Sequence, residues 1–277
     1  MHQHKIKFSE LILRAATWGS AMLTVCVLLY LIGFILVGGI PHIKPQLFYF
    51  TYTSENVSMM PALISTVIIT LMSLVIAAPL GIFAAIWLVE YAKRDNKLTS
   101  VVSIMAETLA GIPSIVYGLF GLLFFVTFLG WGFSVLAGAF TLSIMILPLI
   151  LRSSEEAIKS VPAAWREGAF GLGAGRLRTA LYIVLPAAAP GISAGIILAV
   201  GRIVGETAAL IYTSGTVAQI PLSPAQSART LSVHMYALSS EGFHTGEAYA
   251  TAVILMIIVI FINAVSAMIA RRIGIRK

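Results

Sequence analysis

Six long apolar runs constrain this chain more than any other feature of its sequence. A helix that crosses a bilayer needs about 20 mainly apolar residues, because each residue advances about 1.5 Å along the axis. The runs are continuously apolar and do not alternate with polar residues, which favours membrane helices over the strands of a barrel. They lie at about residues 15–38, 61–89, 101–126, 133–151, 187–212 and 248–270. The sequence therefore predicts an all-α integral membrane protein with six transmembrane helices.

The overall composition agrees with a membrane protein and leaves no room for a separate soluble domain. Hydrophobic residues make up 59% of the chain and charged residues 10%, whereas an ordinary soluble domain has about 25% charged residues. Because the apolar runs are evenly spread, we expect residues 1–277 to form a single transmembrane domain. The first run exceeds the roughly 7 to 15 apolar residues of a signal peptide, so we expect a retained span.

The basic residues predict the orientation of the chain, since Lys and Arg accumulate in short cytoplasmic loops. Fifteen of the 18 lie at the two termini, in the loop after the second run, or in the loop between the fourth and fifth runs. Of the others, Lys44 and Arg229 lie on the opposite side, and Arg202 lies within the fifth run. We therefore expect both termini on the cytoplasmic side. Because the net charge of +7 is gathered between apolar runs, it does not indicate nucleic-acid binding.

The expected cytoplasmic loop between the fourth and fifth runs, residues 152–186, is long and strongly punctuated. Pro162 can begin a helix, glycines near Gly173 can end it, and a second amphipathic segment would run from Arg176 to Pro186. The sequence thus predicts two helices joined by a glycine-rich corner. Such a bent pair suits insertion into a groove of a partner protein.

This loop resembles the signature by which the permeases of ABC importers dock on their ATPase subunits. The positions that match in register are Glu167, Ala169, Gly173, Ile183, Leu185 and Pro186. Gly168 departs from the pattern, because the family usually has alanine there, and glycine lowers helix propensity by about 1 kcal/mol. The resemblance implies the type I ABC importer permease fold. It also implies a segment that couples to a cleft of the nucleotide-binding subunit, made by Arg166, Glu167, Gly168, Ala169, Gly173 and Pro186.

The sequence shows no pattern for chemistry of its own. It lacks the Gly-x-x-x-x-Gly-Lys-Ser/Thr loop that cradles nucleotide phosphates. Its single cysteine is Cys26. His2 and His4 lie at the N-terminus, and the other three histidines are scattered over outer loops without paired spacing for a metal ion. We therefore expect no catalytic residue, metal or cofactor on this chain. By the resemblance, ATP and Mg belong to the partner ATPase subunits.

The fifth run carries two charges, in the sequence Gly201-Arg-Ile-Val-Gly-Glu-Thr207. Arg202 and Glu206 are four residues apart, which would place them on one face of a continuous helix near the middle of the bilayer. A charge there is costly, so it should face a wet cavity or a partner. Arg202 would offer two parallel N–H donors to a tetrahedral oxyanion. Glu206 would pair with the guanidinium when no anion is bound. Thr207 would line the same pathway. The alternative is a structural pair of Arg202 with Glu206 or with another subunit.

Three further residues are candidates for the substrate pathway. Pro113 should kink the third span and free carbonyl groups near Ser114 and Tyr117, although such a kink could also serve packing alone. Arg152 lies four residues before Glu156 at the inner end of the fourth span. With Glu156 it would form a second positively charged substrate contact, at the cytoplasmic end of the pathway. The alternative for Arg152 is a topological anchor.

Three segments are similar to the phosphate importer permeases of the Pst type, namely residues 79–92, 110–121 and 201–210. The lack of a long soluble insertion and the Arg271-Arg272 ending look more like the PstA subunit than like its partner PstC. The resemblance implies a permease subunit of an ATP-driven phosphate importer in the bacterial inner membrane. Its partners would be a PstC-like homologous permease, two PstB-like ATPase subunits and a PstS-like external phosphate-binding protein. The outer loop 213–247 is the expected docking surface for that binding protein.

Other functions stay open at this level. Arg202 alone does not choose among tetrahedral anions, so the same machine could move molybdate, sulfate or a phosphonate. An ATP-independent channel or carrier is a different class, which the coupling signature opposes. An intramembrane enzyme is a further class, for which the sequence shows no constellation of residues.

Overall fold

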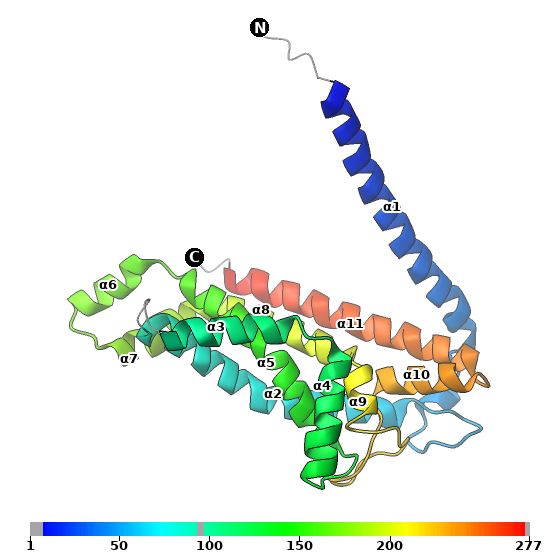
Figure 1. Ribbon diagram of the computed structural model, residues 1–277. Coiled ribbons are helices and arrows are strands. Elements are labelled where there is room, and N and C mark those ends of the chain that lie inside the picture. Colours follow the sequence, from blue (N-terminus) through cyan, green and yellow to red (C-terminus); the bar gives the residue numbers. More distant parts are fainter. Residues whose placement is uncertain (1–7, 93–96, 275–277) are drawn as a thin grey trace.

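The computed structural model describes residues 8–92 and 97–274, and this part of the chain is helical and contains no strand. The helices (Figure 1) are α1 (Phe8–Gly39), α2 (Met60–Ile86), α3 (Lys97–Ala110), α4 (Ser114–Gly121), α5 (Val135–Lys159), α6 (Ala163–Gly171), α7 (Arg176–Thr179), α8 (Leu185–Val204), α9 (Ala208–Ile211), α10 (Leu231–Glu241) and α11 (Thr245–Gly274). Two 3-10 turns follow α1, at Ile40–His42 and Pro45–Phe48. π-Helical turns follow α2, α4 and α7, at Trp87–Tyr91, Leu122–Phe128 and Ala180–Val184. Some basic residues that support the predicted topology lie outside the described residues, namely Lys5, Lys7, Lys93, Arg94, Arg276 and Lys277.

Five helical stretches are long and apolar enough to cross a membrane, and a bent pair makes a sixth. The predicted all-α membrane fold is therefore confirmed. The five stretches are Ile12–His42, Met60–Tyr91, Val135–Lys159, Arg176–Val204 and Thr245–Val265. Because α5 ends later and the next stretch begins earlier than predicted, residues 160–175 separate them in place of the expected loop 152–186.

The third predicted span is broken at Pro113. Its two parts, Thr99–Ala110 and Ser114–Phe128, meet at 101°. Proline has no N–H to donate, and it also disfavours helical geometry at the residue before it. The hydroxyl of Tyr117 donates to the Leu109 carbonyl at 2.7 Å, so it joins the two sides of the break. The kink expected from the sequence is thus a full corner.

The fifth predicted span also differs from a single helix. Its helix continues from Arg176 through a π-helical turn into α8 and ends at Val204. Pro186 lies in the first turn of α8, so the prediction that it closes the coupling loop is wrong. The π-helical turn Ala180–Val184 ends two residues before Pro186, which has no N–H to donate to the helix. After α8, residues 205–207 interrupt the helix before the short α9 begins.

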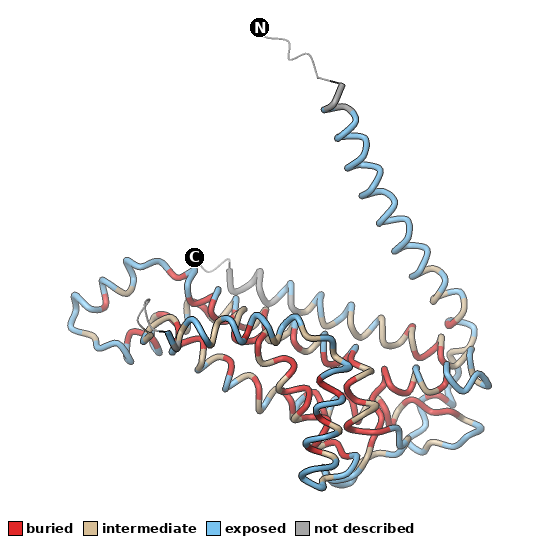
Figure 2. The backbone as a smooth tube through the Cα atoms, in the orientation of Figure 1, coloured by how far each residue is buried: buried red, intermediate tan, exposed pale blue. Residues whose placement is uncertain are grey.

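The centre of the bundle is α5, the most buried of the spans (Figure 2). Its most apolar window is 67% buried, against 6% to 28% in the other four. The Ser73 hydroxyl of α2 donates to the Ala139 carbonyl of α5 at 3.1 Å, and the Ser143 hydroxyl donates back to the Ser73 carbonyl at 3.1 Å. Gly195 of α8 lies so close to Ser153 of α5 that a Cβ atom would collide with it. Hydrogen bonds and small residues of this kind hold helices together in a membrane.

Helix α1 leaves the bundle and packs against it through its C-terminal end (Figure 1). The Phe34 ring meets Tyr249 of α11 edge-on at 5.7 Å. Gly38 and Gly39 allow close approach to the same tyrosine, which an added Cβ would touch. Most of the apolar surface of α1 is exposed (Figure 2). In a membrane, that surface must meet lipid or another subunit.

The close contact of α4 with α9 gives a stability prediction. A Cβ atom at Gly118 would lie 2.8 Å from the Ala209 Cα. Overpacking costs about 1 to 3 kcal/mol, so we expect Gly118→Ala to lower the thermal unfolding midpoint in detergent. Gly19→Ala in α1 is the matched control, since a Cβ atom there meets nothing within 4 Å. Equal midpoints for the two variants would contradict this packing.

Candidate functional site

Arg202 lies in the last turn of α8, beside a cavity between three helices. The cavity has a volume of about 320 Å³ and is lined by Leu149, Leu198, Gly201, Arg202, Val259 and Asn263. Its polar side chains are the Arg202 guanidinium and the Asn263 amide, which face a wall of aliphatic residues. Gly201 leaves open space, because an added Cβ atom would come no closer than 3.9 Å to the Asn263 amide oxygen. Two donors of this kind at one cavity suit an anion.

The expected pairing of Arg202 with Glu206 is wrong. Because α8 ends at Val204, the two residues do not share one helix face. Glu206 is buried, and its Oε1 atom accepts from the Ala209 backbone N–H at 3.1 Å, at the start of α9. The Ser232 hydroxyl donates to the Glu206 carbonyl at 2.5 Å. Among the described residues, no acidic side chain lies within 4 Å of Arg202.

Thr207, Ser114 and Tyr117 lie at the two helix breaks. Thr207 precedes α9 and is half-buried, and its side chain makes no capping bond. Ser114 opens α4 and is half-buried. Tyr117 is buried in the same core cluster as Ile203 and Ala209, so it packs near both breaks. Its hydroxyl already bonds Leu109, which supports a structural role for this residue.

Arg152 contacts another helix and not the acidic residue that the sequence suggested. Its Nη2 atom lies 3.1 Å from Glu107 Oε2 on α3 and donates to the Ser103 carbonyl at 3.3 Å. Glu156, the expected neighbour, is exposed on α5. The predicted grouping of Arg152 with Glu156 is therefore wrong, because the Arg152 guanidinium contacts α3. This pair ties α3 to the central helix.

The coupling segment stands out at one end of the molecule as α6 and α7 (Figure 1). Glu167 and Gly168 are exposed on α6, whereas Ala169 is buried. A Cβ atom at Gly168 would meet nothing within 4 Å, so the alanine usual in the family would fit there. Gly173 has a positive φ of 82°, a conformation that glycine adopts freely, and it turns the chain between the two helices. The predicted helix, glycine corner and second helix are confirmed.

Arg166 fastens this segment to the rest of the protein. Its guanidinium lies 2.8 Å from Glu90 Oε1 in the π-helical turn after α2. It also donates to the carbonyls of Val161 at 2.7 Å and Ile158 at 2.9 Å, next to the end of α5. Both charged side chains are largely buried, at 18% and 9% exposure. Arg166 therefore links α6 to the ends of α2 and α5, in contrast to the exposed Glu167.

Two functional candidates, Asn263 and Glu90, were missed from the sequence. Asn263 is a lone amide within the last apolar run, and that break in an apolar stretch was the available signal. Glu90 gave no comparable signal, because it lies at the expected membrane edge where charges are common. Its partner is 76 residues away along the chain.

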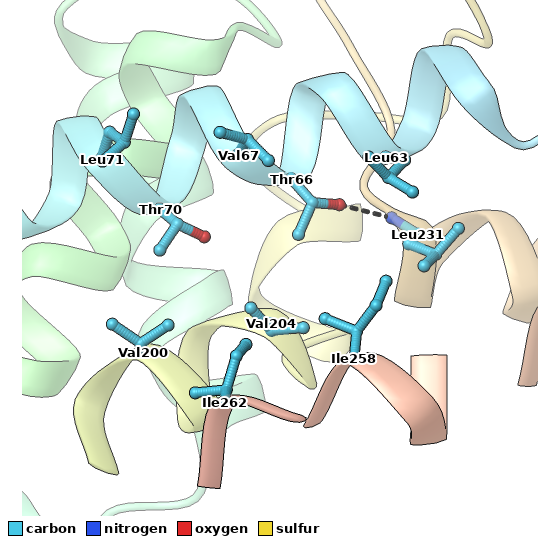
Figure 3. Close-up of a pocket in the computed structure, with 10 residues that line it drawn as sticks. All are labelled: Leu63, Thr66, Val67, Thr70, Leu71, Val200, Val204, Leu231, Ile258 and Ile262. Atoms are coloured by element: carbon cyan, nitrogen blue, oxygen red, sulfur yellow. Dashed lines mark hydrogen bonds between the residues drawn. The ribbon is translucent and has the colours of Figure 1, made fainter. Parts of the chain in front are cut away.

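A larger cavity of about 380 Å³ lies between α2, α8, α11 and the start of α10 (Figure 3). Aliphatic side chains dominate its wall, together with Thr66 and Thr70. The Thr66 hydroxyl accepts from the Leu231 backbone N–H at 2.9 Å, as Figure 3 shows. No charged side chain lines this cavity. The Arg202 cavity is therefore the better candidate for an anion.

Comparison with known sequences gives one family. Residues 77–275 match the family described as binding-protein-dependent transport system inner membrane component. The probable ABC transporter permease protein YqgI of Bacillus subtilis is 33% identical over 239 residues, which are 80% of each chain. The phosphate transport system permease protein PstA 1 of Mycobacterium tuberculosis is 35% identical over 211 residues, which cover 75% of this chain and 69% of the relative.

Solved structures have the same fold. A chain of a bacterial alginate ABC transporter, in complex with an alginate-bound periplasmic protein, superposes with a TM-score of 0.70 and 18% identity over 97% of this chain and 96% of that one. A chain of the MetNI methionine ABC transporter gives a TM-score of 0.60 and 20% identity, with 78% and 94% covered. The chain thus has the type I importer permease fold. It belongs to the family of binding-protein-dependent transport system inner membrane components, as a PstA-like permease subunit of an ABC importer.

Proposed function

We propose that this chain is a transmembrane permease subunit of an ATP-driven phosphate importer of the bacterial inner membrane. The observation that carries the proposal is the Arg202 guanidinium, which lines a cavity with Asn263 and lacks an acidic neighbour among the described residues. A guanidinium keeps its charge and fits the oxygens of a phosphate as a two-pronged donor. The PstA relatives support phosphate as the anion.

The cavity can hold an oxyanion in transit. Arg202 supplies the charge, and the Asn263 amide supplies a neutral donor from α11. Leu149, Leu198 and Val259 offer no polar contact, so the anion would be held from one side only and could leave again. The negative end of the α8 dipole stabilises the guanidinium while the cavity is empty. Substrate passage in this arrangement needs no covalent chemistry on this chain.

Partners supply the energy and complete the pathway. The whole chain serves as one permease domain with both termini in the cytoplasm, and α6 docks through Glu167 on one of two PstB-like ATPase subunits that hold ATP and Mg. The exposed apolar surface of α1 suits contact with a PstC-like homologous permease. A PstS-like binding protein delivers phosphate to the segment 213–247. The main rival is the same machine moving another oxyanion, since the YqgI relative's name gives no substrate.

The proposal is tested by uptake of radiolabelled phosphate into proteoliposomes that hold the complete transporter. We expect ATP-dependent uptake that excess molybdate or sulfate does not displace. Arg202→Gln should lower uptake by about ten- to a hundredfold, because a hydrogen bond to a charged group is worth about 1.5 to 3 kcal/mol. Uptake by Arg202→Lys should lie between that of the wild type and that of Arg202→Gln, since lysine keeps the charge but lacks the forked donor geometry of arginine.

Arg14→Gln is the control, since Arg14 is also exposed but belongs to α1, which leaves the bundle (Figure 1) and does not line the cavity. ATP-independent uptake would overturn the class of transporter. Transport of another anion in place of phosphate would overturn the substrate. Uptake that is equal in Arg202→Gln and Arg14→Gln would overturn the site.

A second prediction concerns the contact of Arg166 with Glu90. Removing one partner leaves the other charge largely buried, which costs about 3 to 5 kcal/mol. We therefore expect Arg166→Gln and Glu90→Gln to abolish phosphate uptake while ATP hydrolysis by the assembled complex continues. The charge-exchanged pair Arg166→Glu with Glu90→Arg should recover part of the uptake. Full uptake in either single variant would show that this contact does not transmit the ATPase movement.

A further inference from the structure

A second cationic cluster lies at the end of the molecule opposite α6 and α7, around the start of α10 (Figure 1). Its charge is Arg229, whose side chain is buried, with the residue only 5% exposed. In the described part of the chain, seven buried side-chain N or O atoms have no hydrogen-bond partner, and four of them belong to this cluster. They are Nε and Nη2 of Arg229 and both ring nitrogens of His234. The two guanidinium nitrogens are donors, and a neutral imidazole adds one N–H donor, so at least three unpaired donors gather in one place and indicate a missing acceptor.

Tyr52 holds the two residues together. The Arg229 Cζ atom lies 4.5 Å from the centre of the Tyr52 ring. The same ring meets the His234 ring edge-on, with centres 6.2 Å apart. A cation over an aromatic face gains attraction from the ring, but the ring does not accept the in-plane N–H bonds of the guanidinium. No acidic side chain lies within 4 Å of Arg229 among the described residues.

The cluster has no other charge to balance Arg229. Burial, followed by the nearby Arg229 charge, lowers the pKa of His234 from 6.5 to about 3, so its ring is neutral near pH 7. The nearby Val57 backbone partly offsets this lowering of the His234 pKa. Neither ring nitrogen of His234 has a hydrogen-bond partner, however. Glu206, near α10, directs its carboxylate to α9. Glu55 is exposed on the segment that carries Tyr52. A ligand that satisfies the cluster must therefore be negative and rich in acceptors.

The segment 51–58, which carries Tyr52, is ordered by hydrogen bonds of its own side chains. The Asn56 amide oxygen accepts from the Thr53 and Ser58 backbone N–H groups at 2.9 and 3.0 Å. The buried Val57 adopts a positive φ of 40°, which is strained for a β-branched residue. Strain of this kind is common where a segment clamps a ligand. Because Arg229 and His234 are both buried, a small ion suits this place better than a protein side chain.

We propose that Arg229, with a His234 N–H beside it, forms a binding site for a small tetrahedral oxyanion. In the predicted topology this site faces the outer side of the membrane, ahead of the Arg202 cavity. That place in the route rests on the proposed function, whereas the oxyanion chemistry does not. Tyr52 positions the guanidinium and does not itself bind the anion.

The test is equilibrium binding of radiolabelled phosphate to the complete transporter in nanodiscs, with no nucleotide and no external binding protein. All proteins carry Arg202→Gln, which removes the other candidate site. We expect saturable binding that Arg229→Gln weakens by about tenfold or more, as expected from loss of a charged hydrogen bond. Arg229→Lys should weaken it less. Arg14→Gln, the control in α1, should have no effect.

Unfolding midpoints show which variants are folded, and Arg229→Lys keeps the test valid if Arg229→Gln does not fold. Unchanged phosphate affinity in a folded Arg229→Gln or Arg229→Lys protein overturns the site. Binding of sulfate or molybdate in place of phosphate, with the same dependence on Arg229, supports the site and overturns phosphate as the substrate. If none of the three anions binds, the oxyanion site is wrong, while uptake by the Arg202 form still supports the transport function.

Discussion

Arg202 places a permanent positive charge on an otherwise apolar transmembrane helix, where it is exposed beside the cavity between α5, α8 and α11. A guanidinium does not lose its proton to escape the membrane interior, so the fold must offer Arg202 a polar surface or a partner. The structure gives it a cavity shared with Asn263 and no carboxylate within 4 Å among the described residues. The nearest acidic residue in sequence, Glu206, is held at the start of α9. The interruption of the helix after Val204 therefore decides whether this arginine is neutralised internally or left for a ligand.

Two interrupted spans pack against the buried central helix α5. Pro113 breaks one span into α3 and α4, and residues 205–207 separate α8 from α9. The two outer pieces, α4 and α9, pack closely at Gly118, while α5 is bonded to α2 through paired serines. At the other end, Arg166 connects α6 with α2 and α5. A displacement of α6 would therefore be transmitted directly to α2 and α5 through the contacts of Arg166.

The sequence predicted the features that depend on local chemistry. Apolar runs predicted the spans, a proline predicted the bend at Pro113, and glycines predicted the corner at Gly173. Features that depend on long-range contacts were not predictable. Spacing suggested that Arg152 lies near Glu156, but its contact is with Glu107 on another helix. The helix rule failed for Arg202 and Glu206 because α8 stops at its C-cap Gly205; that glycine was the available signal, but it lies inside an apolar run that reads as one continuous helix.

The most direct test of the central claim is a cryo-EM map of the complete transporter trapped during phosphate import. We predict tetrahedral density in the cavity between α5, α8 and α11, within hydrogen-bond distance of the Arg202 guanidinium and the Asn263 amide. The contradicting result would show Arg202 paired with a carboxylate of a neighbouring subunit and the anion passing elsewhere. In that case Arg202 would hold the assembly together, and the route of the anion would have to be sought along other residues.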